Sequence, residues 1–380
     1  MRFVLLLFIT SFIFSCRPST TNKKLNNKPE IFRQLTTAEK DKYRADIQLY
    51  YDSILKRSRF NGQIIIAKNN DIIFEQYVGY NDLKLKDTLT PGTPFHVASI
   101  SKTFTALTIL HLAEQNKLKL DDDVKAYLPG FPYDNIKIKL LLNHRSGLPK
   151  YEYFLDKLKY DSILTNQDLL NYIIANKPAL DGMPNKRYQY RNTNYALLAL
   201  IAEKVTGIVF PQYMKDSVFT KLNMPETYVF SISDTANYKP SYWPDNYPAR
   251  LENVDGIYGD KNVYTTARDL LMWDKALYEN SFITKQSYAM ATTPYSNERP
   301  SKHNYGYGFH LFVDSPYTTV YHNGWWHGNM ASFIRLPQDT ATIIVLSNRY
   351  NRAVYTSRKF AKAFGKTNNI EAQEESETKK

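Results

Sequence analysis

Strand-like segments near both ends of the chain enclose a long helical middle, and this order limits the folds that the chain can adopt. Residues 62–67 and 71–77 are rich in β-branched side chains, and the turn formers at 69–70 between them predict a hairpin. Four further segments near the other end are typical of strands: 305–313, 318–322, 330–336 and 341–346. Strands from both ends are expected to pair in one antiparallel sheet covered by helices, an α+β fold.

Helical periodicity fills most of the chain between and beside these strands. Apolar residues recur at helical spacing in the segments 36–57, 118–127, 136–144, 195–205, 210–222, 265–277 and 352–364. Residues 231–255 are rich in Pro, Tyr and Trp and are expected to form a long irregular loop.

The stretch 94–110 carries the main chemical signal. A short apolar lead runs into Ser99, and Phe104, Leu107 and Leu110 then recur every three residues, so Ser99 is expected where a helix begins. Lys102 lies one helical turn further on, which puts its amine on the same face as the serine hydroxyl. A serine is a weak nucleophile until a base takes its proton, and a partly desolvated lysine can be that base.

Short motifs of this kind also arise by chance. Ser53 and Lys56 repeat the spacing inside the charged helix 38–57, where they are explained as two residues on a solvated face. Three consecutive aspartates at 121–123 are expected to mark a helix N-terminus rather than a cation site. The spacing of the four histidines indicates no tetrahedral metal site, so we expect no metal; they are His303, His310, His322 and His327.

The N-terminus has the pattern of an export signal. A positive start and an apolar run over residues 1–15 predict a signal peptide, and Cys16 is the only cysteine of the chain. Residues 13–16 resemble a bacterial lipobox, which implies that Cys16 is lipidated and anchors the protein to a membrane. Residues 16–35 are then expected to be a tether, and residues 367–380 a disordered tail.

The composition narrows the classes of partner. The 380 residues are 43% hydrophobic, and no apolar run after the first fifteen residues reaches membrane-spanning length. A net charge of +12 could indicate nucleic-acid binding. For an exported protein we expect a solvated surface, or one that contacts anionic lipid or envelope polymers, and no nucleic acid.

Three motifs in order then resemble the serine β-lactamase and penicillin-binding-protein superfamily, most closely its class C β-lactamase, D,D-peptidase and esterase branch. They are Ser-Ile-Ser-Lys at 99–102, Tyr-Arg-Asn at 190–192 and His-Asn-Gly at 322–324. Segments 142–149 and 265–270 match as well. The resemblance covers about 60–364 and implies a β-lactamase/transpeptidase-like fold, in which an all-helical domain is inserted into an α/β domain and the active site lies between the two.

The resemblance also implies domain bounds and roles for site residues. The hydrolase domain is expected over 36–366, with an α/β part at about 36–115 and 256–366 and a helical part at about 116–255. Ser99 would form an acyl-enzyme, while Lys102 and Tyr190 would share the proton transfers. Asn192 would hold the lysine amine and a substrate amide.

The third motif implies the oxyanion hole and also departs from the family pattern. The backbone N–H groups of Ser99 and Trp325 would form the hole, and Gly324 would let substrate approach the strand edge. His322 stands where β-lactamases of this branch usually carry a lysine, and it would contact substrate as a mostly neutral group. Trp325 and Trp326 are bulky, and they narrow the pocket, stack on an apolar or sugar group of a substrate, or pack at the strand edge.

These patterns predict a lipid-anchored serine hydrolase of the cell envelope that needs no cofactor and acts on an ester or amide of a small molecule or peptide. One alternative is a true β-lactamase or D-alanyl-D-alanine carboxypeptidase. A second is a non-catalytic envelope binding protein that retains the fold. The sequence does not specify an oligomeric state.

Overall fold

The computed structural model describes residues 31–155 and 162–365. The chain separates into two units, Met1–Ile31 and Phe32–Lys380, and nearly everything described belongs to the second. The expected signal peptide, Cys16, most of the tether and the expected tail lie outside the described residues. The proposed division into an α/β part and a helical part stays a prediction.

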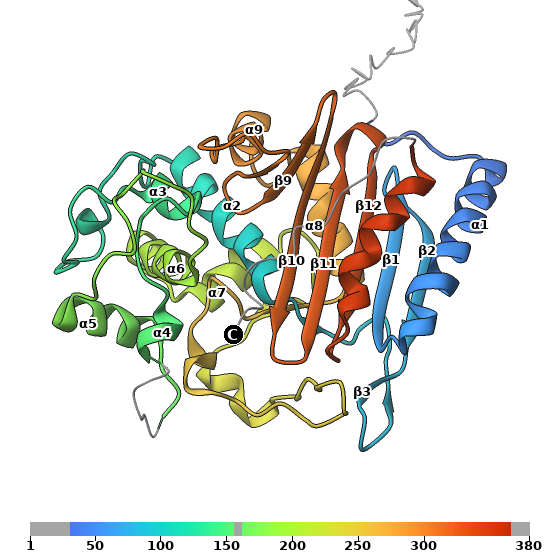
Figure 1. Ribbon diagram of the computed structural model, residues 1–380, viewed down its shortest axis with the longest axis horizontal. Helices are drawn as coiled ribbons and strands as arrows, with labels where there is room; N and C mark the ends of the chain where they lie inside the picture. Colours follow the sequence, from blue (N-terminus) through green and yellow to red (C-terminus); the bar gives the residue numbers. More distant parts are fainter. Residues whose placement is uncertain (1–30, 156–161, 366–380) are drawn as a thin grey trace, which may run out of the picture. The chain divides into compact units, whose positions relative to one another are not determined.

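A seven-stranded antiparallel sheet joins the two ends of the second unit (Figure 1). Its order is β2-β1-β12-β11-β10-β9-β8, so the N-terminal hairpin lies beside the C-terminal strands, with Gly62 opposite Ser347. The strands are β1 (Gly62–Lys68), β2 (Asp71–Val78), β8 (His303–Tyr305), β9 (His310–Asp314), β10 (Tyr317–Trp326), β11 (Asn329–Leu336) and β12 (Ala341–Ser347). The α+β prediction and the hairpin are therefore confirmed.

One predicted strand is wrong in its length. Residues 305–313 form two strands, β8 and β9, because a tight turn interrupts them at Gly308. Gly308 has φ +82°, and a Cβ there would lie 2.5 Å from Cβ of Ala106. The turn therefore presses against a neighbouring helix where only glycine fits.

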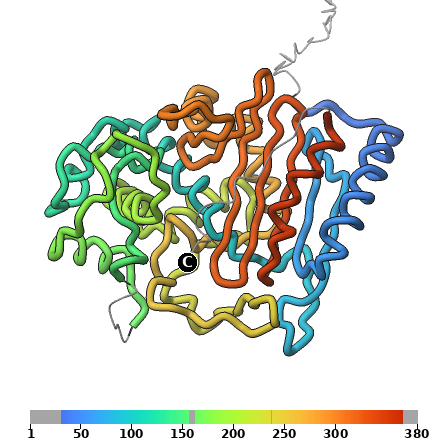
Figure 2. Tube along the Cα trace, in the orientation of Figure 1, coloured from blue at the N-terminus to red at the C-terminus, as the bar shows by residue number. Residues whose placement is uncertain are grey.

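Both faces of the sheet are covered by helices. Ile64 and Ile66 of β1 face a core shared with α1 (Thr37–Ile54) and the final 3-10 helix (Arg352–Ala363), whereas Ile65 points into the opposite core. This alternation is the two-residue period of a strand. In Figure 2 the N-terminal and C-terminal segments of the described chain lie side by side on the first of these faces.

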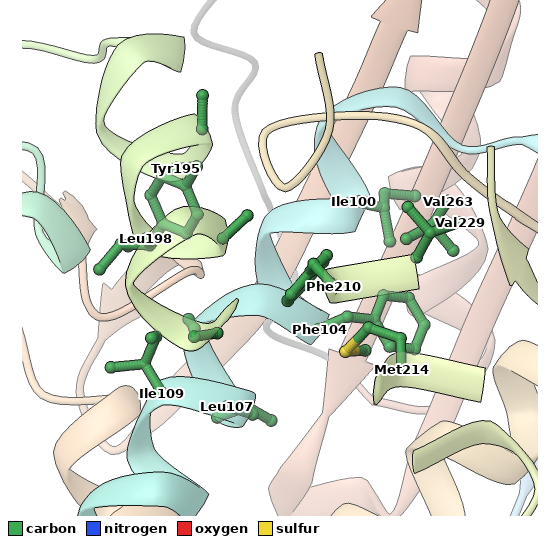
Figure 3. Packing of buried hydrophobic residues seen from close by; sticks show 14 of the residues in the cluster. Ile100, Phe104, Leu107, Ile109, Tyr195, Leu198, Phe210, Met214, Val229 and Val263 are labelled. Atoms are coloured by element: carbon green, nitrogen blue, oxygen red, sulfur yellow. The ribbon is translucent and has the colours of Figure 1, made fainter. Parts of the chain in front are cut away.

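The helix α2 (Ser101–Glu114) lies in the opposite core and is buried on nearly all sides. The sequence predicted one apolar face, but α2 also contacts α6 (Asn192–Thr206), and Thr103, Thr105 and Thr108 are fully buried. Figure 3 shows Phe104 and Ile109 among side chains from α6, α7 (Phe210–Met214) and the neighbouring strands. A helix surrounded in this way is fixed in position.

The middle of the chain contains less helix than its periodicity predicted. Residues 118–127 form one short turn at Val124–Ala126, because Asp122 and Asp123 accept hydrogen bonds from nearby backbone N–H groups. The helices here and beyond are α3 (Ile138–Leu142), α4 (Tyr151–Leu155), α5 (Asn166–Asn176), α8 (Ala267–Glu279) and α9 (Lys285–Ala291). The loop 231–255 is irregular, as expected, apart from turns at Ile232–Asn237 and Asn253–Gly256.

Two small sheets complete the fold. They consist of β3 (Tyr80–Asp82) with β4 (Asp87–Thr88), and of β5 (Phe95–His96), β7 (Val263–Thr265) and β6 (Tyr228–Val229). Over the described residues, no single helix is long and apolar enough to cross a membrane. The pair Asn192–Thr206 and Phe210–Phe219, bent by 75°, passes that test only when taken together.

Candidate active site

Ser99 lies in a single 3-10 turn, Ala98–Ile100, directly before α2. Ala98 has φ +47°, in the left-handed region that a side chain disfavours. The backbone N–H of Ala98 donates to Nδ1 of His96 at 3.3 Å, and the N–H of Ile100 donates to the carbonyl of Val97. The hydroxyl of Ser99 is therefore presented by a constrained turn.

Lys102 lies beside Ser99, as the spacing predicts. Its Nζ donates to Ser99 Oγ at 2.9 Å and to the carbonyl oxygen of Asp260 at 2.8 Å, and the side chain is fully buried. The amine is therefore within hydrogen-bonding reach of the serine hydroxyl, which is the position that a catalytic base needs. The amine also lies 4.8 Å from the ring centre of Tyr190, which brings the first two motifs together.

Tyr190 is held by a buried histidine. The ring of His144 lies 4.3 Å from that of Tyr190, and its Nδ1 accepts the backbone N–H of Arg191 at 3.2 Å. Burial, followed by the charge of Lys102, lowers the pKa of His144 well below its ordinary value. His144 is thus a neutral acceptor that fixes the backbone next to Tyr190.

The third motif packs directly against the Ser99 turn. A Cβ at Gly324 would lie 2.2 Å from the carbonyl oxygen of Val97 and 3.2 Å from Cβ of Ala98. The missing side chain at Gly324 therefore makes room for the protein's own turn, and the approach of substrate to this strand edge stays a prediction. Trp325 follows on β10 opposite Met330, and its indole N–H donates to the carbonyl of His327 at 2.9 Å.

His322 is fully buried on β10. Its Nδ1–H donates to the carbonyl of Asn323 at 2.6 Å, and Nε2 lies 3.3 Å from the hydroxyl of Tyr305. Burial and the nearby charges of His310 and Lys102 lower the pKa of His322 well below its ordinary value. The ring is therefore neutral, and its centre lies 6.3 Å from that of Tyr190.

Asn192 has a different partner from the one expected. Its amide Nδ2 donates to Oε1 of Glu152, while its Oδ1 is buried and accepts no hydrogen bond among the described residues. The amine of Lys102 is held by Ser99 and Asp260 instead. The roles expected of Asn192, holding the lysine amine and a substrate amide, stay predictions.

Several residues of the site's surroundings escaped the sequence reasoning. Asp260 and Lys261 are fully buried, and Lys261 Nζ donates to the hydroxyl of Tyr151 at 2.7 Å, which in turn donates to Asp260 at 2.8 Å. The Nζ atom of Lys261 lies 4.9 Å from the centre of the Trp326 ring. The only local signal was an Asp-Lys pair next to a glycine, a pattern too common to identify a buried site.

Asp255 anchors the tryptophan end of β10. It accepts hydrogen bonds from the indole N–H of Trp326 at 2.6 Å and from His327 Nε2 at 3.0 Å. Although burial opposes its ionisation, the hydrogen bond and charge of His327 lower the pKa of Asp255. Trp326 is thereby fixed against the loop 253–262. Within residues 31–155 and 162–365, no group of three or more His, Cys, Asp or Glu side chains could hold a metal ion.

Comparison with known proteins identifies relatives of this arrangement. A family profile described as "Beta-lactamase" matches residues 33–364. Penicillin-binding protein 4* of Bacillus subtilis is 34% identical over 83% of this chain and 74% of its own length. The structure of a penicillin-binding protein from Bacillus halodurans is 25% identical, with a TM-score of 0.75, over 83% of this chain and 99% of its own. A class C β-lactamase mutant shares the fold at 18% identity, with a TM-score of 0.71, over 87% of this chain and all of its own.

Proposed function

The chain belongs to the β-lactamase family, and from this premise we propose that it is a serine hydrolase that works through an acyl-enzyme. The observation that carries the proposal is the 2.9 Å hydrogen bond between Lys102 Nζ and Ser99 Oγ in a buried setting next to Tyr190. A nucleophile within hydrogen-bonding reach of a base is the arrangement that acyl transfer needs.

The reaction follows from these positions. Ser99 Oγ bonds to the carbonyl carbon of the substrate, and its proton passes to the Lys102–Tyr190 pair. The bond to the alcohol or amine then breaks, and the leaving group takes up that proton. A water molecule attacks the acyl-enzyme, gives one proton to the same pair and returns Ser99 Oγ–H with a free acid. The backbone N–H groups of Ser99 and Trp325 would stabilise the oxyanion.

The neutral state of His322 bears on the substrate class. A buried, uncharged imidazole provides no cation for the carboxylate of a β-lactam or of a peptide C-terminus. We therefore favour an ester or a simple amide over a dedicated β-lactamase substrate. The name of the Bacillus subtilis relative refers to penicillin binding, which keeps β-lactams among the compounds to test.

The proposed setting is the cell envelope. The relatives named as penicillin-binding proteins come from bacteria, and the expected signal at 1–15 with lipidation at Cys16 would place the enzyme outside the cytoplasm on a membrane. Metabolic labelling with an alkyne fatty acid tests the anchor. Label is expected on the full chain and should disappear in the Cys16→Ala variant.

Intact-mass measurement tests the catalytic proposal. The chain from residue 17 onward is incubated with a fluorophosphonate and, separately, with a β-lactam, beside the Ser99→Ala variant. We expect a fluorophosphonate adduct that is absent from the variant, and the β-lactam sample then separates a penicillin-recognising enzyme from an esterase. An absence of adduct with both reagents would favour the non-catalytic binding protein.

A further inference from the structure

The first part of the loop 231–255 lines a cavity to whose residues the proposed mechanism assigns no role. The cavity has a volume of about 310 Å³ and lies where this loop meets the small sheet of β5, β7 and β6. Long irregular loops in compact domains are usually functional, so the cavity is a candidate binding site. Its walls include four aromatic rings and two side chains of opposite charge: Tyr228, Phe230, Tyr238, Tyr264, Asp234 and Lys239.

The aromatic walls are held in place by the small sheet. Tyr228 on β6 lies opposite Tyr264 on β7, and the two rings stack with their centres 5.1 Å apart. The ring of Phe230 lies 5.7 Å from that of Tyr264, and the backbone N–H of Phe230 donates to the carbonyl of Asn262 at 2.8 Å. The ring of Tyr238 lies 6.2 Å from that of Phe230. Because these rings are already fixed, a ligand does not have to order them when it binds.

Two hydroxyl groups and one carboxylate oxygen at this cavity have no hydrogen-bond partner in the described part of the chain. Tyr264 is 9% exposed, and neither its hydroxyl nor that of Tyr228 forms a hydrogen bond with residues 31–155 or 162–365. Burial raises the pKa of both tyrosines, so both keep their O–H groups. Oδ2 of Asp234 accepts the backbone N–H and the hydroxyl of Ser231, at 2.7 Å and 2.9 Å, which leaves Oδ1 without a partner among the described residues. The cavity therefore offers both donors and acceptors.

These groups restrict the chemistry of a ligand. A purely apolar ring would cover the hydroxyl of Tyr264 without pairing it, which costs free energy. Asp234 disfavours an anion in the cavity and Lys239 disfavours a cation, so a neutral ligand is favoured. The volume is at the lower end of the range for small-molecule sites, which suits a single ring. A ligand with all of these properties is a neutral ring that has apolar faces and several hydroxyl groups.

We propose that this cavity is a second binding site of the protein and that it takes one neutral pyranose unit of a sugar. The C–H faces of the sugar would lie against the aromatic walls. Its hydroxyl groups would exchange hydrogen bonds with Tyr228, Tyr264 and Asp234. The cell envelope proposed above would supply such units in its glycans. The site does not depend on the hydrolase proposal, since Ser99 is not among the residues that line it.

A ligand-observed NMR titration of the full chain with methyl β-D-glucopyranoside tests the proposal. The protein is kept in a detergent without a sugar headgroup, so that the detergent does not compete. We expect saturable binding with a Kd of about 1 mM, the scale for a ligand of this size. In Tyr228→Phe and in Tyr264→Phe, the loss of one hydroxyl should raise the Kd about 2- to 10-fold. Both variants keep the stacked rings and the contact between Tyr264 and His96, at 5.0 Å, so the fold should be retained.

A control variant and two control ligands separate the ways in which the proposal can fail. Tyr153→Phe removes a hydroxyl from an exposed tyrosine of α4 and should leave the Kd unchanged. Cyclohexanol, which is a largely apolar ring, and tetramethylammonium, which is a cation, should bind more weakly than the glucoside. No saturable binding of the glucoside, a native Kd in both cavity variants, or tighter binding of either control ligand would overturn the proposal. None of these results requires turnover, so the hydrolase proposal is tested separately, by the adduct at Ser99.

Discussion

Gly324 lies against the carbonyl oxygen of Val97, at a place where a Cβ atom would be only 2.2 Å from that oxygen. Real contacts of this kind do not occur, so the strand β10 and the Ser99 turn can meet only through glycine. The relationship connects two motifs that lie more than 200 residues apart in the sequence. It also fixes the distance between the nucleophile and the strand that follows Gly324.

Gly324→Ala should therefore displace the Ser99 turn or β10. A shift of about 1 Å at the reacting groups costs about 100-fold in rate, and we expect at least that loss in ester hydrolysis. The measurement is kcat/KM together with the melting temperature. Gly92→Ala is the matched control, because a Cβ there meets nothing closer than 3.9 Å and it should retain native activity. Full activity in Gly324→Ala would contradict the packing argument.

The two copies of the Ser-x-x-Lys spacing allow an internal comparison. Lys102→Met removes the amine at Ser99 and should lower kcat/KM by about 100- to 10,000-fold, the usual contribution of a general base. Lys56→Met should have no effect, because Lys56 lies in the 3-10 turn after α1 and pairs there with the exposed Asp52. The hydroxyl of Ser53 donates to the carbonyl of Tyr50 instead. Steady-state ester hydrolysis measures both. Equal effects of the two substitutions would remove Lys102 from the mechanism.

The Tyr190→Phe variant should separate the contribution of the hydroxyl to activity from the contribution of the ring. The ring packs on His144 and lies under the amine of Lys102, and phenylalanine preserves both contacts. We expect a fall in kcat of about 100-fold or more with little change in melting temperature. Tyr188→Phe is a suitable control, since this ring also contacts His144, at 6.1 Å. An equal loss of activity in both variants would show that activity depends on the aromatic cluster and that the Tyr190 hydroxyl has no special part in proton transfer.

His96 should make the stability of the protein sensitive to mild acid. Burial, partly offset by the hydrogen bond with Asn262, lowers the pKa of His96 to about 4. In the unfolded chain His96 has its ordinary pKa of about 6.5. As the pH falls from about 6.5 to about 4, the unfolded state therefore takes up a proton that the folded state does not bind. The free energy of unfolding therefore decreases across this pH range, and the contribution of His96 to this decrease is about 2 kcal/mol at pH 5.

The measurement for His96 is urea unfolding at pH 7 and pH 5. His96→Asn keeps an acceptor near the N–H of Ala98 but does not titrate, so it should lose about 2 kcal/mol less than the native protein between these two pH values. His144 and His322 are also buried and neutral, and both proteins contain them. Their contributions therefore cancel when the stability loss of the variant is compared with that of the native protein. Equal losses in the two proteins would mean that His96 titrates normally in the fold.

Local sequence patterns predicted much of the fold, because hairpins and helix ends are determined by residues that are close together in the sequence. The hairpin at 62–77 follows from β-branched residues around two asparagines, and both Asn69 and Asn70 adopt the positive φ that such a turn uses. The helix expected over 195–205 also follows from local apolar periodicity, and it ends at Gly207, where glycine takes φ +73°. Local patterns failed where side chains redirected the backbone, as Asp122 and Asp123 do at 118–127.

The sequence by itself determined that Ser99 and Lys102 share a helical turn, because residues three positions apart in a helix lie on the same face. Only the tertiary structure decided their surroundings: the carbonyl of Asp260 on the amine, the carbonyl of Val97 against Gly324, and Glu152 on Asn192. These partners are brought together by packing of the sheet, α2 and α6 in one core, and no spacing along the chain encodes which distant group meets which. The motifs therefore predicted the chemistry, and the fold decided which distant groups surround the residues that would carry it.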